Sequence, residues 1–279
     1  MKLLSFSKNG KASFGALVGD GVIDLAKRTK YASLRETLAA DALKEVASAA
    51  TGAADYKLAD VTLLTPVPDA EKIICIGINY RAHCIEVGRA FPEQPSVFLR
   101  LHSSLVASGE DIVRPTVSQD FDYEGELAVV IGKGGHKIGR DKALSHVAGY
   151  TLLNDGSIRD FQLKGSLAIG KNFFATGSVG PVMLTADEVA DPTKLVIETR
   201  LNGKRLQYSG IDDLIFDIPA IIEYVSAAIP LAPGDIIATG TPDGVQLGHK
   251  PSQWMKPGDK LEIEVPQIGI LRNQVVDAR

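Results

Sequence analysis

The hydrophobic pattern divides the chain into a short N-terminal part and a longer part rich in strands. Between residues 2 and 26, three apolar runs are separated by Asn-Gly and Gly-Asp-Gly turns, which indicates short strands. The sequence Ser33-Leu34-Arg35-Glu36 has the spacing of a capping box and predicts a helix that continues to about Ala50. Two prolines in segment 63–72 indicate a linker into the main body of the protein.

Strands dominate the pattern after this linker. Residues 72–78 form a continuous apolar run, which is typical of a strand buried on both faces. Further strand-like runs, most of them bounded by Gly, Pro, Asn or Asp, follow at 96–101, 126–132, 148–155, 195–203, 234–240, 259–265 and 270–276. One helix is predicted between Asp217, which can cap it, and Pro230, which ends it. We therefore predict a mostly β fold, with a small N-terminal α+β domain (residues 1–66) before a large mostly-β domain (residues 67–279).

Composition narrows the class of protein. The 279 residues are 45% hydrophobic and 23% charged, with a net charge of −4 and an isoelectric point near 5.8, so no basic field predicts a nucleic-acid or anionic-lipid partner. Segment 1–7 is too short for the apolar region of a signal peptide, and no stretch approaches the roughly 20 apolar residues of a membrane span. The two cysteines, Cys75 and Cys84, form no metal-spaced cluster. We expect a cytoplasmic protein without a membrane partner.

Three carboxylates are candidates for a metal site. Glu126 begins the run 126–132, and Glu124 lies two positions before it. Residues i and i+2 of a strand share a face, about 7 Å apart. Two like charges beside an apolar core require a cation or a shifted pKa, although a solvated strand face explains this spacing equally well. Asp155, at the end of run 148–155, favours the metal interpretation. Three carboxylates provide the hard oxygen ligands that Mg²⁺ prefers and leave positions open for substrate and water.

Other motifs could carry catalytic chemistry. His83 and Glu86 are three positions apart, so one helical turn would place an orienting carboxylate beside a basic imidazole. A surface ion pair would have the same spacing. Lys171, between Gly170 and an aromatic run, could stabilise an oxyanion, or could lie on the surface with its stem covering apolar neighbours. The turn at 239–245 contains Pro-Asp-Gly, and its hydroxyl and N–H groups could hold a carboxylate.

In this order, the motifs resemble the fumarylacetoacetate hydrolase superfamily from about Val67 to the C-terminus. The motifs that carry the resemblance are GINYRAHCIE (77–86), FDYEGELAVVIG (121–132), NDGSIRDFQ (154–162), GKNF (170–173), LIFDIP (214–219) and TGTPDGV (239–245). The resemblance implies a mixed β-sandwich roll that forms a homodimer and acts on a small keto acid with Mg²⁺ or Mn²⁺. The residues it implies are Glu124, Glu126 and Asp155 for the metal; His83, Glu86 and Lys171 for catalysis; and Arg159, Gln162 and Thr241 for substrate binding.

The resemblance leaves several reactions open. The first hypothesis is a metal-dependent hydrolase that cleaves a carbon–carbon bond in a β-diketo acid of the acylpyruvate or fumarylpyruvate type, through a metal-stabilised enolate. The alternative is a keto-acid decarboxylase, isomerase or hydratase of the same superfamily, acting on an oxaloacetate-like or 2-hydroxydienoate-like acid. A third hypothesis is a metal-stabilised binding or scaffold protein that retains the fold.

The sequence departs from the common family pattern at several positions. Asn172 and Phe174 stand where the family usually has serine and aspartate, and Gly156 stands where it usually has valine. Ile211 replaces a common threonine, and Arg100 replaces a lysine. These changes leave the predicted metal ligands and the His83–Glu86 pair intact, and they bear on the group at the distal end of the substrate.

Overall fold

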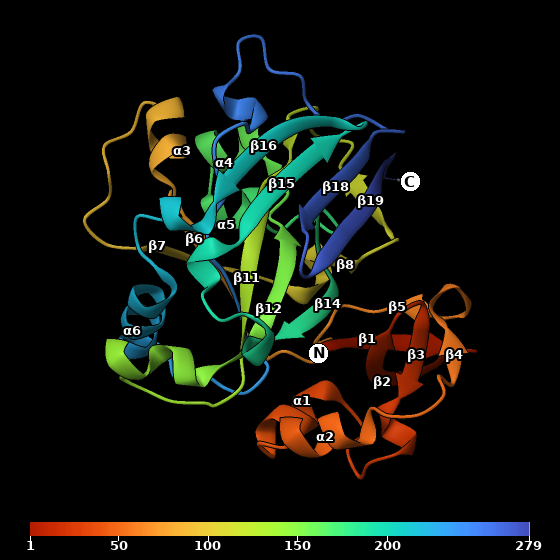
Figure 1. The fold of residues 1–279 in the computed structure, drawn as a ribbon. Helices are drawn as coiled ribbons and strands as arrows, with labels where there is room; N and C mark the ends of the chain where they lie inside the picture. The colour runs from red at the N-terminus through yellow and green to blue at the C-terminus, as the bar shows by residue number, and fades with distance from the viewer. Residues whose placement is uncertain (279) are drawn as a thin grey trace.

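The protein has the mostly β architecture that the sequence predicts (Figure 1). The computed structural model describes residues 1–278. A twelve-stranded sheet forms the frame of the molecule. Its strands in spatial order are β4 (Tyr56–Lys57), β3 (Gly21–Asp24), β2 (Lys11–Val18), β1 (Lys2–Lys8), β14 (Gly177–Thr185), β12 (Val147–Asn154), β11 (Gly125–Ile131), β17 (Ile236–Ala238), β6 (Ile73–Gly77) and β7 (Ser96–Arg100), with β5 (Thr62–Leu63) beside β1 and β8 (Leu105–Ala107) beside β14.

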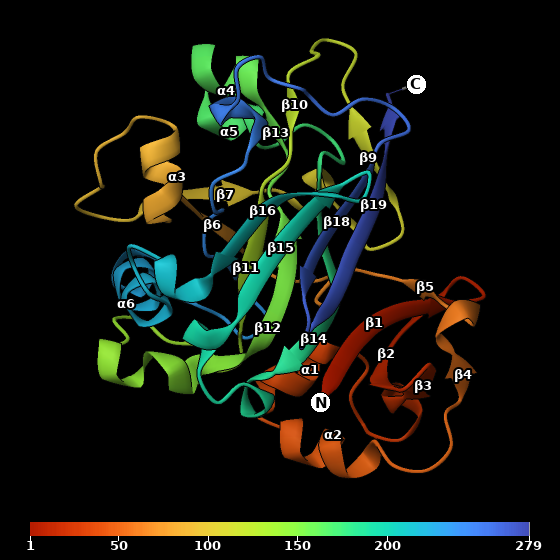
Figure 2. The ribbon, with the colours of Figure 1, turned by 45° about the horizontal axis from the view of Figure 1, so that its top comes forward.

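A second sheet packs across the middle of the first (Figure 2). Its strands in spatial order are β16 (Lys204–Gly210), β15 (Val196–Leu201), β18 (Lys260–Val265), β19 (Gly269–Asp277) and β9 (Asp111–Arg114); a separate pair consists of β10 (Phe121–Asp122) and β13 (Ser157–Ile158). The helices are α1 (Leu34–Ala39), α2 (Leu43–Ala49), α3 (Arg81–Glu86), α4 (Arg159–Lys164), α5 (Leu167–Gly170) and α6 (Ile218–Ala228). None of these described helices is both long enough and apolar enough to cross a membrane.

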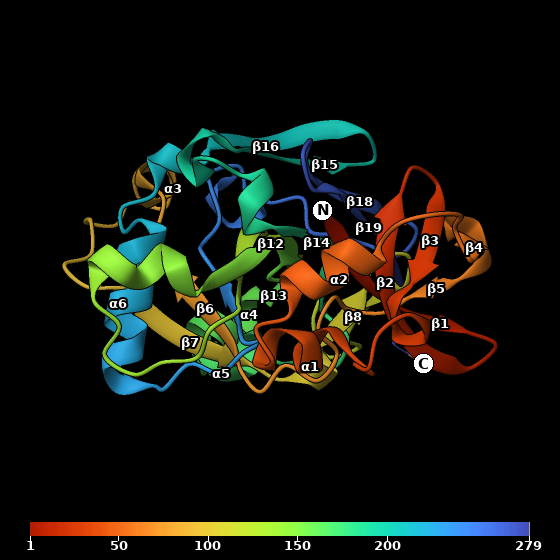
Figure 3. The ribbon, with the colours of Figure 1, turned by 60° about the horizontal axis from the view of Figure 1, so that its bottom comes forward.

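Both faces of the larger sheet are buried, which explains the continuous apolar runs. Along β11, Leu127 and Val129 enter the core beneath the five-stranded sheet, whereas Ala128 and Val130 enter a second core on the opposite face. The helices α1 and α2 contribute to the second core, so β12 and β14 lie between the small sheet and α1 (Figure 3). Alternation between two cores leaves no solvated face on β11, and a polar side chain there must find a partner inside the protein.

The predicted N-terminal helix is correct at its start and wrong in its continuity. Ser33 Oγ accepts a hydrogen bond from the Glu36 N–H at 3.1 Å, as in a capping box. The helical segment then divides into α1 and α2 at Asp41, whose φ of 52° is left-handed and cannot continue a right-handed helix. The prediction of α6 is confirmed, because Asp217 Oδ1 accepts from the Ala220 N–H at 2.9 Å.

The pattern did not predict β14, although this strand joins the N-terminal elements to the rest of the sheet. Pro181 lies within β14 and has no N–H to donate, which usually excludes proline from a central strand. The pairing with β12 accommodates it through a register shift between Tyr150 and Leu152. On its other side, β14 pairs with β1 through Lys2 and Leu3. The sheet is therefore continuous across residue 66, and the division into two domains there stays a prediction.

Candidate active site

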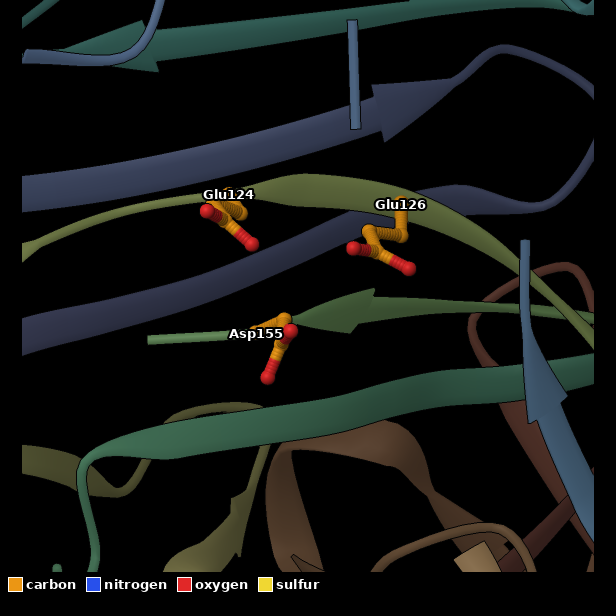
Figure 4. A group of neighbouring side chains, drawn as sticks. All are labelled: Glu124, Glu126 and Asp155. Carbon is orange, nitrogen blue, oxygen red and sulfur yellow. The ribbon is translucent and has the colours of Figure 1, made fainter. Parts of the chain in front are cut away.

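The three predicted carboxylate ligands lie together between the two central strands (Figure 4). Glu124 immediately precedes β11, Glu126 lies within it, and Asp155 immediately follows β12. One carboxylate oxygen from each residue lies within 4.8 Å of those from the other two, and the residues are 6%, 2% and 0% exposed, respectively. The antiparallel register that pairs Gly125 with Asn154 brings the two strand ends together. The interpretation of a solvated strand face is therefore wrong.

The glycine between the two glutamates is required by packing. Gly125 points toward the five-stranded sheet, and a Cβ there would lie 2.1 Å from Thr199 Oγ1 on β15. Its N–H donates to Gln207 Oε1 at 3.0 Å. The close approach of β15 on one side of β11 thus leaves the opposite side for Glu124 and Glu126.

Three buried cationic side chains surround the carboxylates. The Lys171 ammonium lies 2.5 Å from Glu124 Oε2 and 2.7 Å from Asp155 Oδ2. The Arg159 guanidinium lies 2.7 Å from the other oxygen of Glu124, and Arg100 donates to Asp155 Oδ1 at 2.6 Å. Lys171 is 2% exposed, so the interpretation that it lies on the surface is wrong.

The charges do not balance within this group. Four buried carboxylates face three cations: Asp122, Glu124, Glu126 and Asp155 against Arg100, Arg159 and Lys171. Burial acts to raise the pKa of Glu124, but Lys171 and Arg159 outweigh it and lower that pKa to about 2. Burial raises the pKa of Glu126 well above its ordinary value, and the charges of Asp155 and Glu124 raise it further.

Glu126 is the member of the group that lacks a cationic partner. Its Oε2 accepts from the Gly240 N–H at 2.8 Å, and within residues 1–278 no cationic side chain forms an ion pair with it. A divalent cation among the three carboxylates would supply the missing positive charge through hard oxygen ligands. The donor set therefore fits Mg²⁺ or Mn²⁺, with Glu124, Glu126 and Asp155 as the residues that would hold it.

The predicted histidine–glutamate pair forms on α3. His83 Nδ1 lies 2.9 Å from Glu86 Oε2, one helical turn away. A carboxylate oxygen accepts in this contact, so Nδ1 donates, and in the neutral ring Nε2 then keeps its lone pair. Glu86 Oε1 also accepts from the Gly244 N–H at 2.8 Å, in the turn that the sequence singles out. His83 is 3% exposed, so the interpretation of a surface ion pair is wrong.

Asn79 holds α3 in place. Its side-chain amide donates to the backbone oxygens of Phe216 and Thr239 at 3.0 and 2.8 Å, and its Oδ1 accepts from the Phe216 N–H at 2.8 Å. Asp213 accepts from the Ala82 N–H in the first turn of the helix at 3.1 Å. Ile78, just before, has a φ of 54°, a strained value for a β-branched residue. The conformation of this turn is thus maintained by side chains from distant segments.

The carboxylate centre and the His83–Glu86 pair lie beside the same cavity, which has a volume of about 190 Å³. Seven of the nine predicted residues line it: His83, Glu124, Glu126, Arg159, Gln162, Lys171 and Thr241. The other two, Glu86 and Asp155, contact lining residues from behind. Thr241 donates its hydroxyl proton to the Gly125 carbonyl at 3.1 Å and accepts from Gln207 at 2.8 Å. Its proton is therefore engaged within the protein, and its role in substrate binding stays a prediction.

Two residues of this network were not predicted as site residues. Asp122 accepts from Arg159 Nε at 2.9 Å and from the Gln246 and Leu247 N–H groups at 3.0 Å each. Arg100 binds Asp155 and donates to the Gly156 carbonyl at 2.9 Å. The only sequence signal for Arg100 was its replacement of a family lysine.

The structure explains two of the departures from the family pattern, Asn172 and Gly156. Asn172 Nδ2 donates to the Leu99 carbonyl at 3.0 Å, and its Oδ1 accepts from the Leu101 N–H at 2.6 Å, so this side chain binds the edge of β7. Phe174 is 73% exposed and does not line the cavity. At Gly156 a Cβ would lie 1.9 Å from the Thr176 carbonyl oxygen, which excludes the usual valine.

Known proteins share this fold and sequence. The family model described as fumarylacetoacetate (FAA) hydrolase C-terminal matches residues 72–276. "Oxaloacetate tautomerase YisK" of Bacillus subtilis is 44% identical over 226 residues, which cover 79% of this chain and 75% of that protein. A putative HpcE protein from Mycobacterium smegmatis superimposes over 100% of both chains with a TM-score of 0.90 and 33% identity. Maleylpyruvate hydrolase from Sphingobium sp. SYK-6, in complex with manganese (II) ion and pyruvate, does so over 100% of both chains with a TM-score of 0.85 and 31% identity.

These similarities confirm the predicted fold and the predicted family. The family model covers more than half of the chain, and the solved structures match from end to end. The names of the relatives include tautomerases, isomerases and hydrolases, so they agree on an enzyme and differ in the reaction. The chain is an enzyme of the fumarylacetoacetate hydrolase superfamily.

Proposed function

We propose that the protein catalyses the keto–enol tautomerisation of a small 2-oxo acid of the oxaloacetate type. The observation that carries the proposal is the placement of His83, Glu124 and Glu126 around a single cavity, with Asp155 beside the two glutamates. Tautomerisation moves one proton between the 2-oxo oxygen and C3, the carbon next to the carbonyl carbon, and so needs one proton-transfer group at C3 opposite one electrophilic centre at the oxygen. This proposal corresponds to the alternative reaction of the sequence analysis rather than to its first hypothesis.

Each residue of the site would have a separate role in this reaction. A divalent ion bound by Glu124, Glu126 and Asp155 would supply a Lewis acid for the carboxylate and 2-oxo oxygens of the substrate. His83 Nε2 would take a proton from C3 of the keto acid or return one there, and the 2-oxo oxygen would gain its proton from solvent water or lose it to solvent water. Glu86 would keep the ring in the tautomer that leaves Nε2 unprotonated. The Lys171 ammonium would offset negative charge on the substrate oxygen.

The size of the cavity supports a small substrate. Its volume of about 190 Å³ is below the roughly 300–1,000 Å³ of pockets for drug-sized ligands. The relative from Bacillus subtilis is named an oxaloacetate tautomerase and is 44% identical over most of the chain. Both observations favour a compact acid over an extended diketo acid.

Hydrolysis of an acylpyruvate is the second candidate. The His83–Glu86 pair favours it, because a carboxylate-oriented imidazole can also deprotonate water. The maleylpyruvate hydrolase similar to this chain supports it as well. The same metal site serves both reactions, so they differ in whether water or substrate loses a proton to His83.

Turnover of the purified protein distinguishes the candidates. The protein would be treated with a chelator and assayed with and without added Mg²⁺ or Mn²⁺, following the ultraviolet absorbance of enol-oxaloacetate and the release of pyruvate from acylpyruvates. We expect metal-dependent acceleration of enol decay without carbon–carbon cleavage. Metal-dependent release of pyruvate, with no effect on oxaloacetate, would support the hydrolase instead. No turnover with metal bound would favour the binding-protein hypothesis.

The homodimer also stays a proposal. Large apolar side chains are exposed on and near the edge strand β7, among them Leu101 at 60% and Ile169 at 55%. A partner subunit would bury surface of this kind. Light scattering coupled to size-exclusion chromatography would give the mass in solution, and a monomer at micromolar concentration would contradict the proposal.

A further inference from the structure

One cation at the cavity lacks the carboxylate partners that the others have. Arg89 lines the cavity together with Arg159 and Lys171. Arg159 and Lys171 are both paired with carboxylates of the site. In the described part of the chain, by contrast, no carboxylate lies within ion-pairing distance of Arg89, and its guanidinium makes no hydrogen bond to protein. Arg89 is therefore available to an anion that enters from solvent.

The end of α3 determines the position of Arg89. The Arg89 N–H donates to the Cys84 carbonyl at 2.9 Å, and the Gly88 N–H donates to the Ile85 carbonyl at 3.1 Å. Gly88 has a φ of 66°, the left-handed conformation of a glycine that ends a helix. A Cβ at Gly88 would have no neighbour within 4 Å, so backbone conformation, and not packing, requires glycine there. Arg89 is thus attached to the same short helix as His83.

The rest of the cavity wall offers no other unpaired cation. Apart from the groups already described, the lining is apolar or uncharged: Ile76, Gly77, Ile78, Val87, Ser96, Phe98, Leu163, Leu167 and Leu247. A substrate whose first carboxylate and 2-oxo group lie at the carboxylate centre would place its far end among these residues. A negative charge at that far end has Arg89 as its available partner.

We infer that Arg89 binds the distal carboxylate of a dicarboxylic 2-oxo acid. This inference rests on the proposed function and specifies its substrate class, an acid with a carboxylate at each end. The guanidinium can form two parallel hydrogen bonds to a carboxylate, which a lysine cannot reproduce. Because Arg89 is exposed at the mouth of the cavity, the contact is screened by solvent, and we expect it to affect affinity more than turnover.

The test compares Arg89→Gln with Arg81→Gln. Arg81 lies on the first turn of the same helix and does not line the cavity. Both variants replace an arginine with glutamine, so they change the net charge equally. Each variant would be assayed with oxaloacetate and with 2-oxobutanoate, which has a methyl group in place of the distal carboxylate. Hydrogen exchange at C3 in deuterated water, followed by NMR, reports turnover of both compounds.

We expect Arg89→Gln to raise the KM for oxaloacetate about fivefold, with little change in kcat and no change in the KM for 2-oxobutanoate. Arg81→Gln should change KM and kcat for neither compound. The inference would be overturned if Arg89→Gln raised the KM for both compounds equally, or if the two variants had equal effects on the KM for oxaloacetate.

Calorimetric titration of both compounds in the presence of Mg²⁺ separates this inference from the proposed function. If oxaloacetate binds tightly and Arg89→Gln removes its preference over 2-oxobutanoate, the inference holds even when the wild-type protein does not tautomerise oxaloacetate. If the wild-type protein shows no preference for oxaloacetate, or binds neither compound, the inference is wrong.

Discussion

The carboxylate centre and the His83–Glu86 pair face one cavity, but the protein holds them by different means. Glu124, Glu126 and Asp155 are buried at the ends of central strands, and Glu124 and Asp155 form ion pairs with cations from distant segments. The pair, in contrast, is on the six-residue helix α3, which follows β6 beside the edge strand of the sheet.

This difference separates stability from activity. A buried charge that loses its partner destabilises the fold, because the remaining charge stays out of water. Helix α3 is anchored by Asn79, which precedes it and binds the backbone of Phe216 and Thr239, and by the bond from the Gly244 N–H to Glu86. It can therefore lose the His83 side chain with less effect on the fold. We therefore expect substitutions in the pair to reduce the rate, and substitutions around the carboxylates to reduce the free energy of unfolding.

The largest effect is expected for His83→Ala. Loss of the proton-transfer group should lower kcat about 10³-fold, which corresponds to about 4 kcal/mol in the activation barrier. Thermal unfolding and Mg²⁺ affinity should change little, because the carboxylates are untouched. Ile85→Ala, at a 72% exposed position of the same helix, is the control. Unchanged turnover in His83→Ala would exclude His83 from proton transfer.

A smaller effect, on stability, is expected for Arg100→Met. The substitution leaves Asp155 buried without this guanidinium, and we expect the free energy of unfolding to fall by about 3 kcal/mol. Arg100→Lys restores the charge of the family residue and should recover part of the loss. Urea denaturation of the metal-free protein measures both. A loss below that of a surface substitution would mean that Lys171 alone compensates Asp155.

Packing beneath the carboxylates gives the third prediction. Gly125→Ala places a methyl group against Thr199 and forces β11 and β15 apart, at a cost of about 2 kcal/mol. Gly77→Ala is a matched control on β6, because its nearest neighbours lie at an ordinary 3.7 Å and its φ is not left-handed. Equal denaturation midpoints for the two variants would contradict the packing argument.

Local patterns of the sequence predicted more of the site than its overall composition did. The spacing of Glu124 and Glu126 placed both on one face, and the spacing of His83 and Glu86 placed both on one helical turn. Both predictions depend on contacts within a few residues, where the geometry of a strand or a helix is sufficient. The strand and helix geometry is the same in this protein as in any other.

Sequence patterns could not predict the contacts between distant segments of the chain. Arg100 reaches Asp155 across 55 positions, and no periodicity connects them. The bulge beside Pro181 in β14 depends on the partner strand β12, which the residues around Pro181 do not reveal. In the N-terminal region, the left-handed Asp41 divides a segment whose composition favours one continuous helix.

The smallest effect is expected for Asn172→Ala, which tests how the two regions are joined. Asn172 fills the hydrogen-bonding positions of the β7 edge at Leu99 and Leu101, and it follows Lys171 directly. Loss of these two bonds, together with the bond from Asn172 Nδ2 to the Ala168 carbonyl, should cost about 1 kcal/mol of stability. It should also lower kcat modestly, because the Lys171 ammonium is less well positioned. Phe174→Ala, at an exposed position of the same segment, is the control. If Asn172→Ala lowers stability without any effect on kcat, the β7 contact fixes only the edge of the sheet, and Lys171 is positioned by Glu124 and Asp155 alone.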